Sequence, residues 1–171
     1  QGGHAGMALH RLLETSSTSF NLKAAAHLSG PYDISTSMTN LLLGEEEYEF
    51  VAYAANVALS FNRIYGIFPN DLASDLFIEP YASEIEKFRR EEIDLWKLNE
   101  FMLKELKKNS GKTQPKRMVI PSLVTEITTN PNHPIRLALI DNDVYDWKPG
   151  IPTRLLYCKA DDQVSYKNSL V

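Results

Sequence analysis

The sequence has 171 residues, of which 43% are hydrophobic, and 18 basic against 22 acidic residues give a net charge of −4. This length and composition suffice for one domain with a hydrophobic core. With an excess of acidic residues, the composition gives no indication of a basic surface for nucleic acid. There is also no apolar run of about twenty residues that would span a bilayer. A lone cysteine, Cys158, excludes an internal disulfide, and its apolar surroundings in the sequence predict a buried core residue.

The first residues predict a tight turn that leads into a helix. Gln1-Gly2-Gly3 places a glycine pair, which allows close approach of two backbones, before an amphipathic segment that starts at Ala5. Such a pair before a helix is also typical of a helix with a flexible start. The following segment, Leu22 to Ser29, predicts a strand.

A helical insertion is predicted between this strand and a second one. Well over a hundred residues separate Ser29 from Arg154, whereas a helical crossover between parallel strands needs about a dozen. Apolar spacing, Ser83 and Glu86 as a capping box, and prolines at first turns define the predicted helices. These helices cover Tyr48 to Tyr65, Ser83 to Gly111, Pro121 to Thr129 and Pro134 to Ile140. The apolar face predicted for the first consists of Phe50, Ala54, Val57, Phe61 and Ile64. The apolar phase slips near Arg89 to Glu92, so the second region could form one helix or two.

The second predicted strand, Arg154 to Lys159, is short and apolar, and we expect it to be buried. It is followed by Asp161 and Asp162. A carboxylate at the C-terminal end of a parallel strand can act as the acid of a catalytic triad, which orients a histidine base. Aspartate is also an ordinary turn residue, which is the alternative interpretation of both positions.

Four stretches in the right order give the chain a resemblance to the α/β-hydrolase superfamily, specifically to serine hydrolases of the secretory-lipase, esterase and peptidase-like kind. They are Gln1-Gly2-Gly3-His4, His27-Leu28-Ser29-Gly30-Pro31-Tyr32-Asp33, Asn142-Asp143-Val144-Tyr145-Asp146-Trp147-Lys148-Pro149 and Lys159-Ala160-Asp161-Asp162-Gln163-Val164. The resemblance covers both ends of the chain well and the middle loosely. It implies a partial α/β-hydrolase fold, with two parallel strands and a flanking helix, that begins just after the nucleophilic serine.

The resemblance also implies roles for particular residues. Asp161 would be the triad acid, and the backbone N–H of Gln1 would be one oxyanion-hole donor. No serine precedes Gln1 and no histidine follows Asp161, so the nucleophile and the base would lie outside this chain, which alone would be inactive. Residues 1–34 and 142–171 would be hydrolase core segments, and residues 35–141 would be a helical cap or lid over the site.

The partners implied are a small-molecule ester or acyl substrate, with no cofactor, no metal, no nucleic acid and no membrane span. Open sheet edges could lead to self-association. The location is left open by the sequence, and the resemblance alone favours a secreted or periplasmic protein. None of the four histidines, His4, His10, His27 and His133, has the spacing of a metal site, and His27 is expected to be a hydrogen-bonded core residue. The alternative function is a non-catalytic helical interaction or binding module with hydrolase-like ends.

Overall fold

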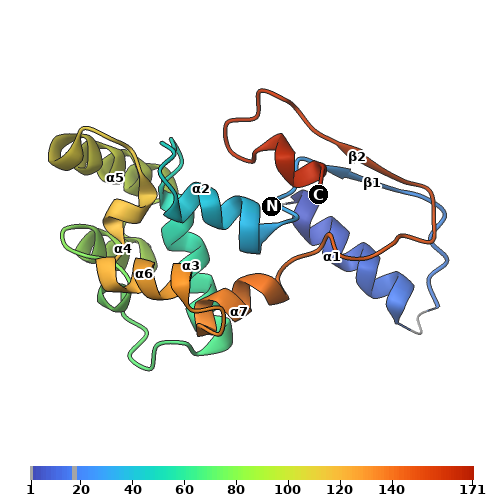
Figure 1. Ribbon diagram of the computed structural model, residues 1–171, viewed down its shortest axis with the longest axis horizontal. Helices are drawn as coiled ribbons and strands as arrows, with labels where there is room; N and C mark the ends of the chain where they lie inside the picture. The colour runs from blue at the N-terminus through green and yellow to red at the C-terminus, as the bar shows by residue number, and fades with distance from the viewer. Residues whose placement is uncertain (1, 17–18) are drawn as a thin grey trace. The chain divides into compact units, whose positions relative to one another are not determined.

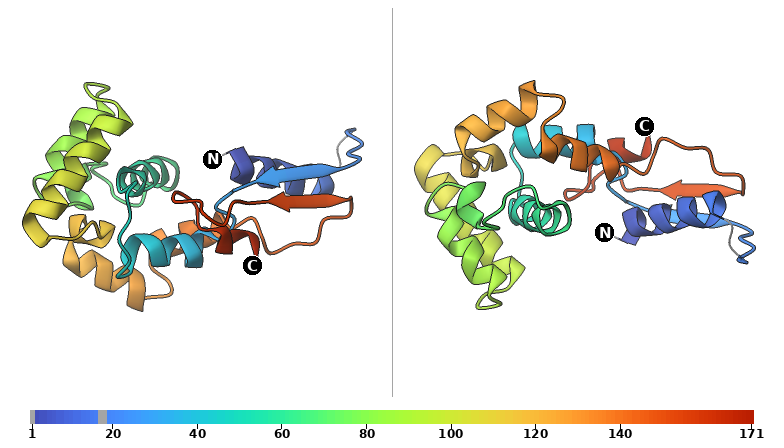
Figure 2. Two further views of the ribbon diagram at one scale, coloured as in Figure 1. Left: turned by 90° about the horizontal axis from the view of Figure 1, so that it is seen from above. Right: turned by 90° about the horizontal axis from the view of Figure 1, so that it is seen from below.

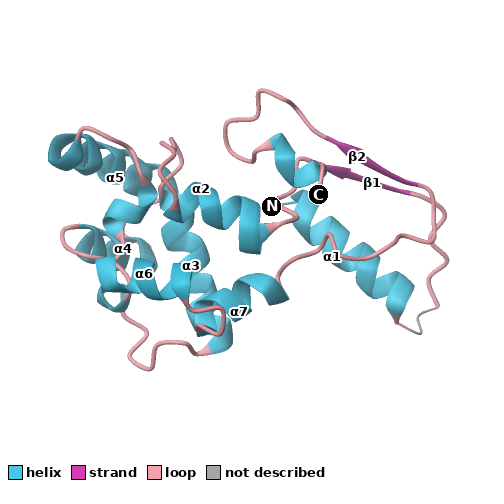
Figure 3. Cartoon of the chain, in the orientation of Figure 1, coloured by secondary structure: helices cyan, strands magenta, loops and turns pink. Residues whose placement is uncertain are grey.

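The computed structural model describes residues 2–16 and 19–171. The chain divides into two compact units, which we name by content. The strand unit comprises Gln1–Met38 and Leu139–Val171, and the helical unit comprises Thr39–Ala138. Within the part of the chain that is described, both strands belong to the strand unit (Figures 1 and 3).

The strand unit contains helix α1 (Gly2–Thr15) and the strands β1 (Ala25–Leu28) and β2 (Thr153–Leu156). The strands pair in parallel, with Ala25 opposite Thr153 and Leu28 opposite Leu156. Figure 2 shows both arrows pointing the same way, with α1 beside them and running in the opposite direction. The predicted parallel pair with a flanking helix is therefore confirmed.

The two faces of this sheet are covered unequally. His27 of β1 is buried towards α1, whereas Leu28 is 62% exposed and Leu156 of β2 is 47% exposed. The prediction of a buried strand from Arg154 to Lys159 is wrong in both extent and burial, and Cys158 is exposed. The reason is that α1 packs against β1, Leu156 lies on the uncovered face of the sheet, and Cys158 lies past the last paired residue.

Two glycines permit the close packing of α1 on β1. A Cβ on Gly3 would clash with the carbonyl oxygen of Leu28 and lie 2.8 Å from the Gly30 nitrogen. A Cβ on Gly30 would lie 2.7 Å from the His4 nitrogen. The first turn of α1 and the exit of β1 thus touch backbone to backbone, which only glycine allows.

The helical unit has a core of its own. The helices that begin within it are α2 (Thr39–Leu43), α3 (Ala52–Tyr65), α4 (Tyr81–Arg89), α5 (Leu95–Ser110), α6 (Pro121–Thr129) and α7 (Pro134–Asp141), the last of which ends in the strand unit. Buried side chains of α3 to α6 and of the segments between them form one hydrophobic cluster, in which Ile85, Leu98 and Met102 are completely buried. The phase slip near Arg89 to Glu92 does mark a break, because α4 and α5 are separate helices.

The start of α4 and the buried face of α3 differ from the prediction. Ser83 does not cap α4, because its hydroxyl donates to Glu79 at 2.9 Å, and Glu86 instead accepts from the Ala73 N–H at 2.7 Å. Helix α3 buries Ala52, Ala55 and Asn62, whereas the predicted apolar face leaves Ile64 77% exposed. Small side chains in α3 therefore face the core, and larger ones lie at its margin.

Candidate functional site

Asp161 lies in a tight turn beyond β2. Its N–H donates to the Cys158 carbonyl at 3.2 Å, and its Oδ1 accepts from the N–H groups of Gln163 at 3.0 Å and Val164 at 2.9 Å. The residue is partly exposed, and its Oδ2 takes part in neither hydrogen bond. Oδ1 therefore stabilises the turn, as the turn interpretation expects, and the catalytic role of Asp161 remains a prediction.

The end of β1, the end of β2 and the first turn of α1 meet at one edge of the sheet, where both strands have their carboxyl ends. The Ser29 N–H donates to the Leu156 carbonyl at 2.8 Å, so β1 and β2 end together. The contacts of Gly3 with Leu28 and Gly30 place the first turn of α1 at the same edge, which Figure 2 also shows. The predicted oxyanion donor, Gln1, lies outside the described residues.

The segment after β1 is organised by two aspartates. Asp33 is buried, and its carboxylate accepts from the N–H groups of Thr36 and Ser37 at 3.0 Å each. The Asp143 Oδ1 accepts from the Ile34 and Ser35 N–H groups at 2.8 and 2.9 Å. Both carboxylates thus cap the start of the π-helical turn Ile34–Met38. This explains the two aspartates in the matched stretches, for which the sequence had suggested no partners.

A chain of hydrogen bonds connects α1, β1 and the segment before β2. His10 and His27 are both buried, and His10 Nδ1 lies 3.1 Å from His27 Nε2. The second nitrogen of His10, Nε2, lies 2.7 Å from Glu14 Oε1, and Glu14 Oε2 accepts from the Gly150 N–H at 2.6 Å. The expectation that His27 is a hydrogen-bonded core residue is confirmed. The pairing itself was not predicted, although the spacing of His10 and Glu14 on one helix face is visible in the sequence.

The electrostatics of this cluster follow from burial and from these contacts. Desolvation lowers the pKa of His27 below its ordinary value, and repulsion by His10 adds to the effect. The Gly150 N–H, followed by the hydrogen bond and charge of His10, holds the pKa of Glu14 below its ordinary value. Glu14 is therefore ionised at neutral pH, and His27 resists protonation.

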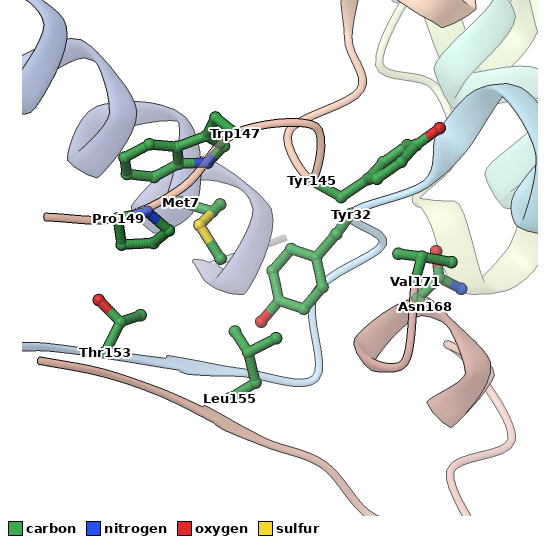
Figure 4. Close-up of a pocket in the computed structure, with 9 residues that line it drawn as sticks. All are labelled: Met7, Tyr32, Tyr145, Trp147, Pro149, Thr153, Leu155, Asn168 and Val171. Atoms are coloured by element: carbon green, nitrogen blue, oxygen red, sulfur yellow. The ribbon is translucent and has the colours of Figure 1, made fainter.

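A pocket of about 260 Å³ lies within the strand unit (Figure 4). Its lining combines aromatic and aliphatic side chains with two small polar ones: Met7, Tyr32, Tyr145, Trp147, Pro149, Thr153, Leu155, Asn168 and Val171. The Tyr32 hydroxyl is buried and makes no hydrogen bond, and burial raises the pKa of Tyr32, although the nearby Gly30 N–H opposes this effect. Asp161 is not part of the lining, so this pocket is not the predicted catalytic position.

The described residues offer polar side chains but no candidate metal site. Across residues 2–16 and 19–171, no group of three or more His, Cys, Asp or Glu side chains is placed to hold a metal ion. The same residues include no helix with the length and apolar character needed to cross a bilayer.

Solved structures with similar folds include an esterase and a protein provisionally described as a hydrolase. The rice cell wall degrading esterase LipA from Xanthomonas oryzae is 24% identical with a TM-score of 0.76, and the match covers 99% of this chain and 44% of that one. A mutant of the same esterase is 25% identical with a TM-score of 0.72 and covers 99% and 43% of the two chains. A protein from Legionella pneumophila, provisionally described as a hydrolase, is 20% identical with a TM-score of 0.78 and coverage of 99% and 42%.

These likenesses define the class of fold. The chain has a partial α/β-hydrolase fold, of two parallel strands and a flanking helix with a large helical insertion between them. It spans less than half the length of the solved structures that it matches. No family model matches the sequence, and no curated protein matches it. The hydrolase-like kind of the chain therefore rests on its fold.

Proposed function

We propose that this chain is part of a serine hydrolase that cleaves small carboxylic esters by acyl transfer to water. The observation that carries the proposal is the convergence of the first turn of α1 with the ends of β1 and β2 at one edge of the sheet. In open α/β sheets, sites lie at the carboxyl ends of the strands. The fold likeness to an esterase agrees with this arrangement.

In this proposal each matched residue has a separate task. Asp161 is the triad acid, and its Oδ2 is the oxygen available to a histidine because Oδ1 is held by the turn. The backbone N–H of Gln1 donates to the oxyanion of the tetrahedral intermediate. Residues 1–34 and 142–171 form the core segments, residues 35–141 form a cap that shapes substrate entry, and no cofactor takes part.

The attacking serine and the histidine base are assigned to parts of the hydrolase outside these 171 residues. The chain alone is then inactive, because loss of a triad nucleophile or base costs about 10⁴-fold or more in rate. The residues encoded directly upstream of Gln1 provide a direct check. Gly-x-Ser at those positions supports the proposal, and any other residue in place of the serine overturns it.

The role of Asp161 is tested in the protein made from the whole reading frame. Asp161→Asn is expected to lower kcat for a short activated ester, p-nitrophenyl butyrate, by about 10⁴-fold, as removal of the charge does in a known triad. The substituted amide keeps an oxygen for the Gln163 and Val164 N–H groups, so the turn is retained.

The matched control is Asp162→Asn, which changes the neighbouring exposed carboxylate. It is expected to keep kcat within about twofold, since surface substitutions away from special features change little. Equal losses in the two variants, or no loss in either, would remove Asp161 from the catalytic role.

The competing proposal, a non-catalytic helical module, is favoured by the self-contained core of the helical unit. It predicts a whole protein without esterase activity at any pH. Activity that survives rigorous purification and disappears with Asp161→Asn, in a protein with an unchanged circular dichroism spectrum, excludes it.

A further inference from the structure

The His10–His27 pair is a buried titratable group that the proposed reaction does not use. His10 is 3% exposed and His27 is 5% exposed, and their stacked rings lie 5.3 Å apart between centroids. The pair joins helix α1 to strand β1, and Glu14 extends it through Gly150 to the segment before β2.

The hydrogen-bond geometry fixes which ring nitrogens carry a hydrogen when both imidazoles are neutral. An ionised carboxylate only accepts hydrogen bonds, so His10 Nε2 carries a hydrogen and donates to Glu14. Neutral His10 then has a bare Nδ1, which accepts from His27 Nε2. All three contacts are satisfied with both rings neutral and Glu14 charged.

One added proton can be accommodated. With a hydrogen on both nitrogens, His10 keeps its bond to Glu14 and donates from Nδ1 to His27, whose remaining hydrogen moves to its own Nδ1. A second proton cannot be accommodated, because two N–H groups would then face each other across 3.1 Å between two positive rings.

We propose that Glu14, His10 and His27 form an acid-sensitive latch, which holds one added proton with its contacts intact and releases α1 from β1 when a second proton binds.

The surroundings supply little charge to offset the second proton. On α1, Glu14 is the carboxylate in contact with the pair, and Arg11 is directed to the Asp143 carbonyl at 3.4 Å. The segment before β2 contributes Trp147, whose ring lies nearly perpendicular to that of His10 with 4.9 Å between centroids, while Asp146 and Lys148 are exposed. On β2, the residue opposite His27 is the uncharged Leu155.

The direction of the pH dependence follows from the lowered pKa of His27. The ordinary pKa of histidine, 6.5, applies to the unfolded chain. The unfolded chain therefore binds this proton more readily than the folded chain, in which the pKa of His27 is lower. The stability that neutral His27 contributes is complete above about pH 6.5 and is lost as the pH falls below it.

Trp147 offers a local reporter of the latch, because a protonated imidazole in contact with an indole quenches its fluorescence. The experiment uses the 171-residue chain with Trp96→Phe, which leaves Trp147 as the single tryptophan. Trp147 emission and the ¹⁵N shifts of the two imidazole rings are followed from pH 8 to pH 4.5, together with hydrogen exchange of the α1 and β1 amides. As the pH falls, a first step is expected in which Trp147 fluorescence is quenched while the amides stay protected from exchange. A second step at lower pH is then expected, in which the amides of α1 and β1 lose this protection.

His27→Gln tests the second step, because the amide oxygen still accepts from His10 but cannot take a proton. This variant is expected to keep the first step and lose the second, whereas the control His4→Gln, on the first turn of the same helix, keeps both. Should His27→Gln fail to fold, Glu14→Gln serves instead, since it removes the charged acceptor of His10 Nε2 and is expected to alter the first step. Protection that stays unchanged with both rings protonated, or a second step that persists in His27→Gln, overturns the proposal.

Discussion

At the scale of single residues, short polar side chains hold the strand unit together where it has few buried apolar ones. The unit's hydrophobic cluster has only Met7, Tyr32 and Val144 as buried members among the described residues. Asp33 compensates by satisfying N–H groups of the turn that follows it, and the Ser37 hydroxyl also donates to its Oδ2 at 2.6 Å. Removing a buried acceptor therefore costs more here than removing an exposed charge.

Asp33→Ala is expected to destabilise the protein by about 1–3 kcal/mol, because it removes the buried acceptor of the Thr36 and Ser37 N–H groups. Urea unfolding followed by circular dichroism measures the loss. Asp162→Ala, at an exposed position, is the matched control and should stay within about 0.5 kcal/mol of the parent. A loss for Asp33→Ala no larger than that of the control would show that water replaces the carboxylate.

At the scale of elements, the sequence predicted helices best where backbone rules act locally. Pro121 and Pro134 mark the first turns of α6 and α7, and Gly111 ends α5 with a φ of +69°. Prediction failed where distant side chains compete, as Glu86 does by bonding Ala73 rather than capping α4. The prediction that β2 is buried failed for a related reason. Whether a strand is covered depends on the elements that pack against it, and its own residues do not specify these.

The candidate site shows the same division. The turn at Asp161 was predictable, since an aspartate binds N–H groups two and three residues onward. The contact between His10 and His27 depends on how α1 packs against β1, which is set by Gly3 and Gly30. Residue spacing alone carries no information about such a contact.

Helix α5 offers a test of local capping. The Asp94 carboxylate accepts from the Lys97 N–H at 2.8 Å, and this is the N-cap contact of the helix. Asp94→Ala is expected to cost about 1 kcal/mol, and Asp94→Ser much less, because a serine hydroxyl can replace the acceptor. Thermal unfolding of the three proteins measures the difference, and equal midpoints for Asp94→Ala and the parent would contradict the capping role.

At the scale of the whole molecule, the two units differ in how their stability arises. The helical unit is one continuous stretch with a dense apolar core, whereas the strand unit combines two distant stretches and leaves Leu28 and Leu156 exposed on one sheet face. Stability is expected to follow buried apolar area, so the helical unit should resist local opening more strongly.

Native-state hydrogen exchange measures this difference. Amides of α3 and α5 are expected to exchange at least tenfold more slowly than those of α1 and β1, which corresponds to about 1.4 kcal/mol in opening free energy. Residues 39–138 produced alone provide the independent arm and should unfold cooperatively, because their core residues all lie within that stretch. Uniform exchange rates across both units, together with an unfolded 39–138 fragment, would mean that the helical unit depends on the strand unit for its fold.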